Sequence, residues 1–230
     1  GYFLTKYQAS EKSKKIKEIL NLKLLELTYF YPVFRKIFNE AEIQKLCNDP
    51  INFQSSYPFQ WGMNELGFKK RGYNLSFLNK VSVLELETYL QNVLLRDADQ
   101  MGMANSLEIR VPFLDHKLVQ YVLNLPDQYK YPNYPKQLLI ESTKGWIPDE
   151  IIYRKKMGFV LPWENWMKNE LQYFCLNAIE SLENISFFNM NNINLLWKRF
   201  LKGDKSIHWL QIWNLVVIGK WTAINNKKIY

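Results

Sequence analysis

The clearest pattern in the sequence is an apolar stripe between residues 86 and 101. Apolar side chains recur there at steps of three and four residues, at Leu86, Tyr89, Leu90, Val93, Leu94, Ala98 and Met101. This spacing predicts an amphipathic helix of about four turns. At roughly 100° of rotation per residue, Asp97 lies near the middle of the stripe, whereas Asp99 points to the opposite side. We therefore expect Asp97 to lie on a buried helix face.

A carboxylate on a buried face needs a partner, because burying a lone charge is costly. Arg110 follows the turn after this helix and can form a bidentate pair with Asp97. The pattern predicts either a structural ion pair without chemistry or a charge close to a functional site. The stretch from Leu94 to Asp115 sets these charges among apolar residues, and we interpret it as the structural hinge of a site.

The rest of the chain also predicts mainly helices. Helical segments are expected at residues 6–25, 22–38, 116–125, 136–144, 150–153, 162–182 and 206–224. Pro32 should interrupt the second segment, Asp115 should cap the third before Pro126 ends it, and Gly145 should end the fourth. Residues 49–79 lack periodicity and predict a long irregular connection with room for one short helix. The last segment is expected to pack through one aromatic-rich face, which carries Trp209, Ile212, Trp213, Val216, Val217 and Trp221.

Length and composition favour one sizeable globular domain of 230 residues, and the high aromatic share argues against global disorder. No apolar run could span a bilayer, and residues 1–30 lack the apolar core of a signal peptide.

Cys47 and Cys175 lie far apart, which predicts two buried thiols in a reduced, cytoplasmic setting. With His116 and His208 as the only histidines, a histidine-based metal site has almost no ligands. The chain begins without an initiator Met, so we expect it to be a piece of a longer protein.

The formal net charge of +8 permits a phosphate-bearing or otherwise acidic partner without requiring one. One basic cluster has an informative setting, because Arg154, Lys155 and Lys156 precede Gly158 in the stretch RKKMGFVLPW. Cations beside a flexible glycine suit a loop that closes on phosphates. The same string is equally compatible with an exposed basic turn.

Residues 96–116, RDADQMGMANSLEIRVPFLDH, closely resemble the signature of the synthetase domain of glutamine-dependent asparagine synthetases. Further motifs follow in that family's order: Lys136 with Leu138-Leu139 resembles its K-x-L-L helix, residues 147–151 its L-P-x-x-I step, residues 154–159 its R-x-K-x-G-F loop, and HWLQIWNLVVIGKW its terminal Trp-rich helix. The resemblance is weak over residues 25–80 and strong over residues 85–170. Several ordered motifs are a far more specific signal than a lone glycine pattern.

The resemblance implies an ATP-dependent ligase. In this family an N-terminal glutaminase domain releases ammonia from glutamine. The synthetase domain activates aspartate with ATP and Mg²⁺ as a β-aspartyl adenylate, and ammonia then displaces AMP. The implied partners are the small molecules aspartate, ATP and glutamine-derived ammonia, with neither a membrane nor nucleic acid, and a homodimer of the full-length form is compatible with the family.

The same resemblance assigns roles to individual residues. Lys156 would be the catalytic cation that neutralises the α-phosphate and the leaving pyrophosphate as charge builds. Arg154 and Gly158 would contribute to ATP binding, the first by anchoring the loop and the second by letting it move. Three charged residues of the signature would support the acceptor side of the pocket without acting as catalysts: Asp97, Glu108 and Arg110. No metal ligand is implied within these residues.

The implied fold class is mainly α for this chain, as the helical C-terminal half of an α/β adenine-nucleotide alpha-hydrolase-like synthetase domain. Residues 1–230 would form the C-terminal segment of that domain. The pyrophosphate loop S-G-G-x-D-S, the G-x-G-S-D-E motif and the glutaminase Cys are absent and would lie upstream of Gly1. ATP and Mg²⁺ would be bound mainly there, so we expect these residues alone to be inactive. Gly102 stands where the family usually has Ser, a change that would loosen the turn.

Two other interpretations remain open. A related amide-forming enzyme on the same scaffold, such as a β-lactam synthetase, a lasso-peptide cyclase or an amidotransferase acting on sugar acids for surface polysaccharide, would share the adenylation step. A basic helical module that binds nucleic acid or a protein partner without catalysis is supported only by the net charge.

Overall fold

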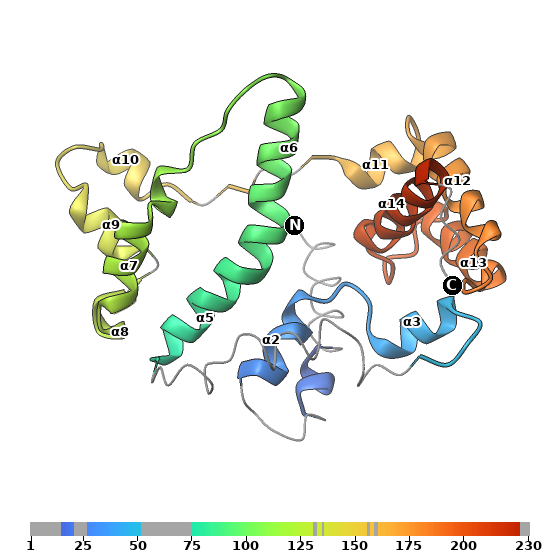
Figure 1. Cartoon of the computed structure of the whole chain (residues 1–230), viewed down its shortest axis with the longest axis horizontal. Helices are drawn as coiled ribbons and strands as arrows, with labels where there is room; N and C mark the ends of the chain where they lie inside the picture. Colours follow the sequence, from blue (N-terminus) through green and yellow to red (C-terminus); the bar gives the residue numbers. More distant parts are fainter. Residues whose placement is uncertain are drawn as a thin grey trace. The chain divides into compact units, whose positions relative to one another are not determined.

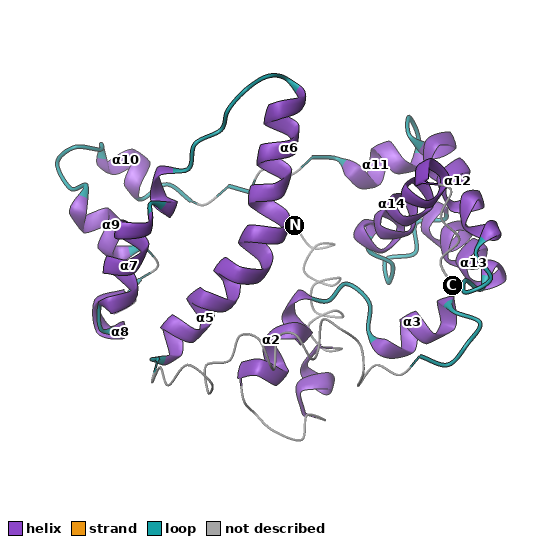
Figure 2. Cartoon of the chain, in the orientation of Figure 1, coloured by secondary structure: helices purple, strands orange, loops and turns teal. Residues whose placement is uncertain are grey.

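The computed structural model describes residues 15–20, 27–51, 75–130, 133–134, 136–155, 157–158 and 161–225. Figure 2 shows helices joined by loops over these residues, and they contain no β-strand. The prediction of a mainly α chain is confirmed for the described part. The chain separates into two compact units: unit 1 comprises Gly1–Met63 and Phe159–Tyr230, and unit 2 comprises Asn64–Gly158.

Unit 1 is built from helices at both ends of the chain. Besides a short helical segment at residues 15–20, its elements are α2 (Leu27–Arg35), α3 (Glu40–Leu46), α11 (Trp163–Lys168), α12 (Gln172–Glu180), the 3₁₀ turn η4 (Ser181–Asn184), α13 (Met190–Leu201) and α14 (Trp209–Asn225). Helices α12 and α14 pack against each other (Figure 1). Their core contains fully buried side chains from each of the later helices, among them Met167, Ile179, Leu182, Ile193, Phe200, Ile212 and Val216.

The two ends of the chain are joined within unit 1 by a short hydrogen-bonded seam, which links the residues just after α3 to those just before α13. Asn48 N donates to Phe187 O at 2.9 Å, and Asn189 N donates to Leu46 O at 2.8 Å. The Asn48 side chain adds a bond to the carbonyl of Ser186 at 2.7 Å. Since backbone groups at helix ends otherwise need water or a cap, this seam fixes α3 onto the C-terminal helices.

Helix α2 continues through Pro32, so the prediction that this proline interrupts the helix was wrong. The helix ends at Arg35, and Lys36 N still donates to Pro32 O at 2.9 Å. Proline removes one N–H donor, but its carbonyl still accepts in the normal register.

The predicted single helix at residues 162–182 is two helices, α11 and α12, because the chain breaks at Asn169. The Asn169 side chain donates to Asn165 O at 2.9 Å and to Asn165 Oδ1 at 3.0 Å. Leu171 N reaches back to Trp166 O at 2.7 Å, one residue further than an α-helical bond. An Asn that binds nearby backbone offers an alternative to the helical ladder, which explains the break.

Helix α14 confirms the predicted terminal packing helix, although its buried side is rotated from the expected one. The buried positions are Gln211, Ile212, Leu215, Val216, Gly219 and Thr222, whereas Val217 and Trp221 are exposed. Gly219 explains the rotation, because a Cβ atom there would lie 1.8 Å from Ala178 O of α12. The backbones of α12 and α14 therefore approach each other at a position where only glycine fits.

The described part of unit 2 starts, after residues 75–76, with one long helical stretch, which combines α5 (Phe77–Glu85), the π-helical segment η2 (Leu86–Leu95) and α6 (Arg96–Ala104). It continues with η3 (Pro112–Leu114), α7 (His116–Asn124), α8 (Asp127–Lys130), α9 (Gln137–Ser142) and α10 (Asp149–Ile152). The predicted helix at residues 86–101 is thus confirmed and begins earlier than expected. Most of the predicted irregular connection at 49–79, and the segment before residue 15, lie outside the described residues.

A polar cluster ties the start of α5 to α7 and α8. Asn79 is buried, and its Nδ2 donates to Leu123 O at 2.8 Å. Lys130 donates to Asn79 Oδ1 and to Leu123 O. The Asp127 carboxylate accepts from Leu78 N at 3.2 Å. Both the Nδ2 donor and the Oδ1 acceptor of the buried Asn79 amide therefore have a hydrogen-bond partner, as a polar group removed from water requires.

The apolar side chains of unit 2 are, by contrast, mostly uncovered. Leu84 is its one buried apolar side chain among the described residues. The end of α6 and the stretch after it expose a run of apolar side chains that includes Met101, Met103, Leu107, Ile109, Val111 and Phe113. This many exposed large apolar side chains within thirteen residues are more typical of an interaction face than of an ordinary solvated surface.

Candidate functional site

The 96–116 signature forms the end of a helix, a tight turn and an extended segment in unit 2. Helix α6 ends where Asn105 N and Leu107 N both donate to Gly102 O at 2.9 Å. Ser106 has a left-handed backbone with φ of 58°, a conformation that costs free energy for a residue other than glycine. The extended residues then run to η3 and to Asp115.

Gly102 holds this turn together, contrary to the expectation that glycine at this position would loosen it. It is buried, and a Cβ atom would lie 2.8 Å from Leu107 O and 3.0 Å from the Ile109 side chain. The missing side chain therefore allows the extended segment to return directly over α6.

Asp97 is exposed, so the prediction of a buried carboxylate was wrong. The ten residues before α6 form the π-helical segment η2, whose i→i+5 bonds widen each turn. The prediction counted the direction of each side chain around the helix from Leu86 at 100° per residue. Over the π-helical segment this count accumulates an error, so it gives the wrong face for Asp97. The apolar stripe itself is only partly covered, since Val93, Leu94 and Met101 are exposed.

Arg110 pairs with Glu108 instead of Asp97. Arg110 Nε donates to Glu108 Oε1 at 3.1 Å, and the two side chains are 81% and 71% exposed. A pair this open contributes little to stability, because water screens it. The two residues therefore present charge to solvent beside the apolar run and do not neutralise a buried group.

Asp115 confirms the prediction of a helix cap. Its carboxylate accepts from Lys117 N at 2.9 Å and from Leu118 N at 3.3 Å, and α7 begins at His116. These bonds satisfy two of the N–H groups that a helix start leaves without partners.

The basic loop follows directly after α10. The helix closes where Tyr153 N donates to Asp149 O at 2.9 Å, and Arg154 and Lys155 are non-helical and exposed. Gly158 is also exposed, whereas Lys156 lies outside the described residues. Neither Arg154 nor Lys155 makes an ion pair with another described residue. The loop therefore holds at least two cations whose charge faces solvent.

No hydrogen bond or ion pair between described residues links the 96–115 stretch to Arg154, Lys155 or Gly158. The site residues predicted from the sequence thus form two groups within unit 2. A hollow of about 340 Å³ lies beside the first group, between η2, α6 and η3, and Arg110 is its one charged lining residue. The sequence reasoning missed this hollow because it depends on how the extended segment packs against the helix.

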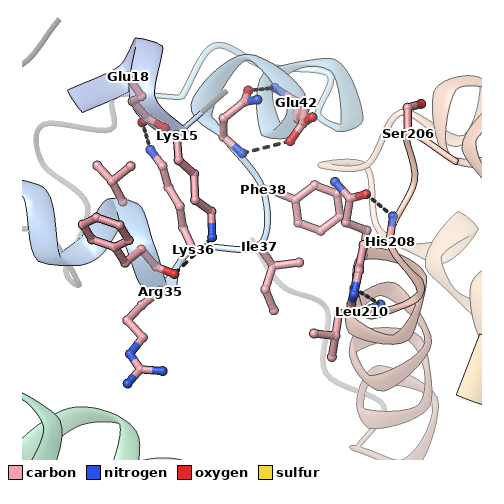
Figure 3. A pocket seen from close by; sticks show the side chains of 14 residues that line it. Lys15, Glu18, Arg35, Lys36, Ile37, Phe38, Glu42, Ser206, His208 and Leu210 are labelled. Atoms are coloured by element: carbon pink, nitrogen blue, oxygen red, sulfur yellow. Dashed lines mark hydrogen bonds and ion pairs between the residues drawn. The ribbon is translucent and has the colours of Figure 1, made fainter. Parts of the chain in front are cut away.

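A second cavity, of about 270 Å³, lies in unit 1 between α2, α3 and the start of α14 (Figure 3). Lys36 pairs with Glu18, and Lys15 Nζ donates to Phe34 O at 3.1 Å. Burial lowers the pKa of Lys36, against the raising effect of the nearby carboxylates. Charges of both signs thus offset each other on this side of the cavity.

Several other polar groups of that cavity complete helix ends. Asn39 and Glu42 cap α3 reciprocally, at 2.8 and 3.0 Å. His208 N donates to Gln211 Oε1 at 3.0 Å, and Leu210 N donates to His208 Nδ1 at 3.2 Å. Because these groups serve the local backbone, the cavity carries no evident reactive group, and we do not assign chemistry to it.

The two cysteines are free and buried, as predicted from their spacing. Burial raises the pKa of both thiols, that of Cys175 to about 11. Both are therefore protonated at neutral pH and poorly nucleophilic.

In the described part of the chain, no three His, Cys, Asp or Glu side chains are grouped so that they could hold a metal ion. No described helix is long and apolar enough to cross a membrane.

Comparison with known proteins identifies the family. The model of the family described as asparagine synthase matches residues 3–223, which cover all of unit 2 and most of unit 1. The chain belongs to the asparagine synthase family. This result confirms the resemblance inferred from the ordered motifs, and the family is one of ligases. No solved structure matches the chain.

Several curated family members are similar to this chain. The glutamine-hydrolysing asparagine synthetase 1 of Bacillus subtilis is 33% identical over 156 residues, which cover 67% of this chain and 24% of that protein. Asparagine synthetase 3 of the same organism is 42% identical over 96 residues, or 41% of this chain and 14% of that protein. The amidase chyE of Penicillium rubens is 29% identical over 138 residues, or 55% of this chain and 20% of that protein. The chain thus spans about a quarter, or less, of the length of these relatives.

Proposed function

We propose that this chain is the C-terminal segment of a synthetase domain that forms an amide bond at the expense of ATP. The observation that carries this proposal is the family match over residues 3–223 together with the ordered motifs. Relatives named glutamine-hydrolysing asparagine synthetases favour aspartate as the substrate that is activated. The reaction we propose is formation of β-aspartyl-AMP, followed by attack of glutamine-derived ammonia with release of AMP.

Lys156, Arg154 and Gly158 are the residues that we propose to act on ATP. Transfer of the adenylyl group to the aspartate carboxylate releases pyrophosphate, so negative charge builds on the α-phosphate and on the leaving group. A lysine ammonium placed there stabilises that charge where it develops. Arg154, which is exposed at the start of the loop, would anchor the loop or assist Lys156 at the phosphates with its planar guanidinium, and Gly158 would let the loop move.

Asp97, Glu108 and Arg110 have a supporting role in this proposal. All three are exposed on the 96–115 stretch of unit 2, and Glu108 and Arg110 form a pair that presents both charge signs. Such a pair beside an apolar hollow could orient neighbouring groups around an acceptor substrate. These side chains would hold the acceptor side of the pocket, and the bond-forming chemistry would occur elsewhere.

ATP and Mg²⁺ would be held mainly outside this chain. The exposed cations of the basic loop fit the phosphates of ATP, but the described residues offer no acidic cluster for a divalent cation. We propose that Mg²⁺ and the nucleotide base bind to an α/β sheet that completes the domain. The exposed apolar run of unit 2 gives this sheet a face against which it can pack. Cytoplasmic location and a homodimer of the full-length protein belong to the same proposal.

A second candidate is an amide-forming relative that uses a different acceptor. The similarity to a Penicillium amidase favours this candidate, since a family scaffold can serve a different substrate. Measuring ATP–pyrophosphate exchange with aspartate and with other carboxylic acids in turn would decide between the two. Exchange that does not depend on aspartate would exclude asparagine synthesis.

Replacing Lys156 tests the proposed chemistry directly. In a protein that contains the whole synthetase domain, Lys156→Ala should abolish aspartate-dependent ATP–pyrophosphate exchange while leaving glutamine hydrolysis intact. A loss of a hundredfold or more, on the order of that seen when one charge-stabilising donor is removed, is expected in kcat. The matched control is Lys155→Ala, which removes an equal charge from the next position and should change the exchange far less.

Two results would contradict this assignment. Normal exchange in Lys156→Ala would show that the loop has no role at the phosphates, and an equal loss in Lys155→Ala would show a general effect of charge.

The 230-residue chain by itself should show no ATP binding by calorimetry. Tight binding there would mean that the nucleotide site lies within these residues.

A further inference from the structure

A third cavity, which we call the α13 cavity, lies in unit 1 between α3, α13 and the start of α14. Its volume is about 250 Å³, somewhat below the size at which pockets for drug-sized molecules begin. The hydrogen-bonded seam after α3 fixes the helices on either side of it. Apolar side chains make most of its wall: Phe38, Leu46, Leu195, Leu196 and Ile207. The α13 cavity therefore has the size and lining of a site for one small, partly apolar molecule.

Gln211 supplies a buried polar group in this wall. Only 7% of the residue is exposed, and its Oε1 accepts from His208 N at 3.0 Å. Since that bond fixes which end of the amide is the oxygen, Nε2 remains as a donor. No described residue accepts a hydrogen bond from Nε2. A buried donor without a partner costs free energy, so this group needs an acceptor that the described residues do not supply.

The start of α14 does not by itself require glutamine at position 211. Gln211 is the third residue of α14, and a glutamate there would accept from His208 N equally well, because capping boxes use either residue. Glutamine differs from glutamate in having the Nε2 donor and no charge. The part of Gln211 that the helix start does not use is therefore the part available to the cavity.

The α13 cavity also has one lining cation without a described ion pair. Lys45, near the end of α3, lines the cavity and is exposed. Its backbone is held there because Asn192 Nδ2 of α13 donates to Lys45 O at 2.7 Å. The other lining cation, Arg199, is already paired with Asp204 at 2.7 Å. The ammonium group of Lys45 is therefore available to balance the charge of a ligand.

The single carboxylate among the lining residues does not reverse this balance. Glu42 Oε2 accepts from Asn39 N at 3.0 Å, and the Glu42 charge interacts with that of Lys36, which lines the neighbouring cavity. The N-terminus of α14, which follows the lining residues Ser206 and Ile207, adds the positive end of a helix dipole. Donors and positive potential thus face the α13 cavity, and its polar side suits an acceptor that carries negative charge.

We propose that the α13 cavity binds a small carboxylic acid in its ionised form, with an apolar body. One carboxylate oxygen accepts from Gln211 Nε2, Lys45 balances the charge, and the apolar body lies against Phe38 and Leu196. The role that we assign to the site is binding and not reaction. The inference does not depend on the ATP chemistry of the basic loop, and neither the family match nor any relative's name assigns a ligand to this part of unit 1.

Isothermal calorimetry with benzoate as the probe tests this inference. The titration uses a protein with the whole synthetase domain, in saturating aspartate, which occupies the proposed acceptor site so that benzoate cannot bind there. We expect saturable binding of one benzoate per chain. Benzamide, which has the same shape but no charge, should bind more weakly. Benzylamine should not bind, because its ammonium group would meet donors and positive potential.

Gln211→Glu is the deciding variant. It keeps the size of the side chain and the acceptor for His208 N, but it replaces the Nε2 donor with a negatively charged oxygen. The Kd for benzoate should rise roughly tenfold or more, since a hydrogen bond to a charged group is exchanged for repulsion. Lys45→Gln changes an exposed position, so it keeps the test open if Gln211→Glu fails to fold, and it should raise the Kd about twofold to fivefold.

Lys198→Gln is the matched control. It removes an equal charge from an exposed position of α13 that does not line the cavity, and it should leave the Kd unchanged. Lys156→Ala should also bind benzoate normally, whatever its effect on ATP–pyrophosphate exchange. A failure of the proposed function and a failure of this inference are therefore distinguishable.

Three results would overturn the inference. An absence of saturable benzoate binding would mean that the α13 cavity holds only water. Equal affinity in the unmodified protein, Gln211→Glu and Lys45→Gln would place the bound benzoate elsewhere. Tighter binding of benzylamine than of benzoate would make the cavity a site for cations.

Discussion

Asp204 shows how one carboxylate organises the entry to the longest described α-helix. Its two oxygens accept from Ser206 N at 2.9 Å and Ser206 Oγ at 2.7 Å, and from Arg199 Nε at 2.9 Å and Nη2 at 2.7 Å. The bonds from Ser206, and after them those from Arg199, lower the pKa of Asp204 to about 2. The turn between α13 and α14 therefore depends on the ionised form of this side chain.

Asp204→Asn should accordingly destabilise the protein in a pH-dependent way. The folded-state pKa of about 2 lies below the usual value for aspartate, so the ionised carboxylate contributes its full stability above about pH 4. That contribution is lost as the pH falls through the folded pKa. The difference in free energy of unfolding between the two proteins, measured with urea, should be largest near pH 7 and should shrink toward pH 3. An unchanged difference between these two pH values would contradict the assignment.

Among the elements, α12 and α14 depend most on close backbone approach. Gly219 lies against Ala178 O, and the side chains around this crossing are fully buried, as Ile179 and Val216 show. Helices that approach this closely gain dispersion contacts along their length, but they lose tolerance for added volume.

Gly219→Ala should therefore destabilise the chain although alanine is the better helix former. Helix propensity alone favours alanine by about 1 kcal/mol, whereas overpacking a tight contact costs about 1–3 kcal/mol and sometimes more. The net effect should be a lower midpoint in urea unfolding. Val217→Ala, at an exposed position of the same helix, serves as control and should change the midpoint only slightly. A stabilised Gly219→Ala variant would mean that α12 and α14 are further apart than described.

At the scale of elements, the sequence predicted those helix ends that depend only on residues close by in the chain. Asp115 caps its helix and Gly145 has the positive φ of a helix end, because both depend only on nearby backbone groups. The exposure of Asp97 was not predictable, because the π-helical segment before it changed the rotation per residue. The break at Asn169 likewise depends on a side chain competing for backbone bonds.

The candidate site was likewise predictable only where it depends on residue type and spacing along the chain. The motifs identified the family and drew attention to the basic loop, since residue type and spacing carry that signal. The pairing of Arg110 with Glu108 and the place of Gln211 in the wall of the α13 cavity are tertiary features, and one-dimensional periodicity cannot specify which of several near residues a side chain will meet.

On the scale of the whole molecule, the two units differ in how completely they bury their apolar side chains. Unit 1 has a continuous core across α11 to α14, whereas unit 2, in its described part, buries Leu84 and leaves the run from Met101 to Phe113 exposed. Water in contact with such a run favours any association that covers it.

The 230-residue chain on its own should therefore self-associate. Sedimentation velocity should show an average mass that rises with protein concentration, and the double variant Met101→Glu, Phe113→Glu should shift the distribution toward monomer. Ile224→Glu places the same charge at an exposed apolar position of unit 1 and should leave the association unchanged. A monomer at all concentrations would show that the run is covered within the chain.

The seam between α3 and α13 has a consequence for how the protein is made. Glu40 and Met190 are far apart in sequence, and at about 5–20 residues per second a ribosome needs roughly 8–30 s to translate the chain between them. During that interval the backbone groups of Leu46 and Asn48 have no partner, because Asn189 and Phe187 have not yet been synthesised. Unit 1 therefore completes its fold only after Phe187 and Asn189 have been synthesised, and chaperones that shield nascent apolar helices should raise its yield.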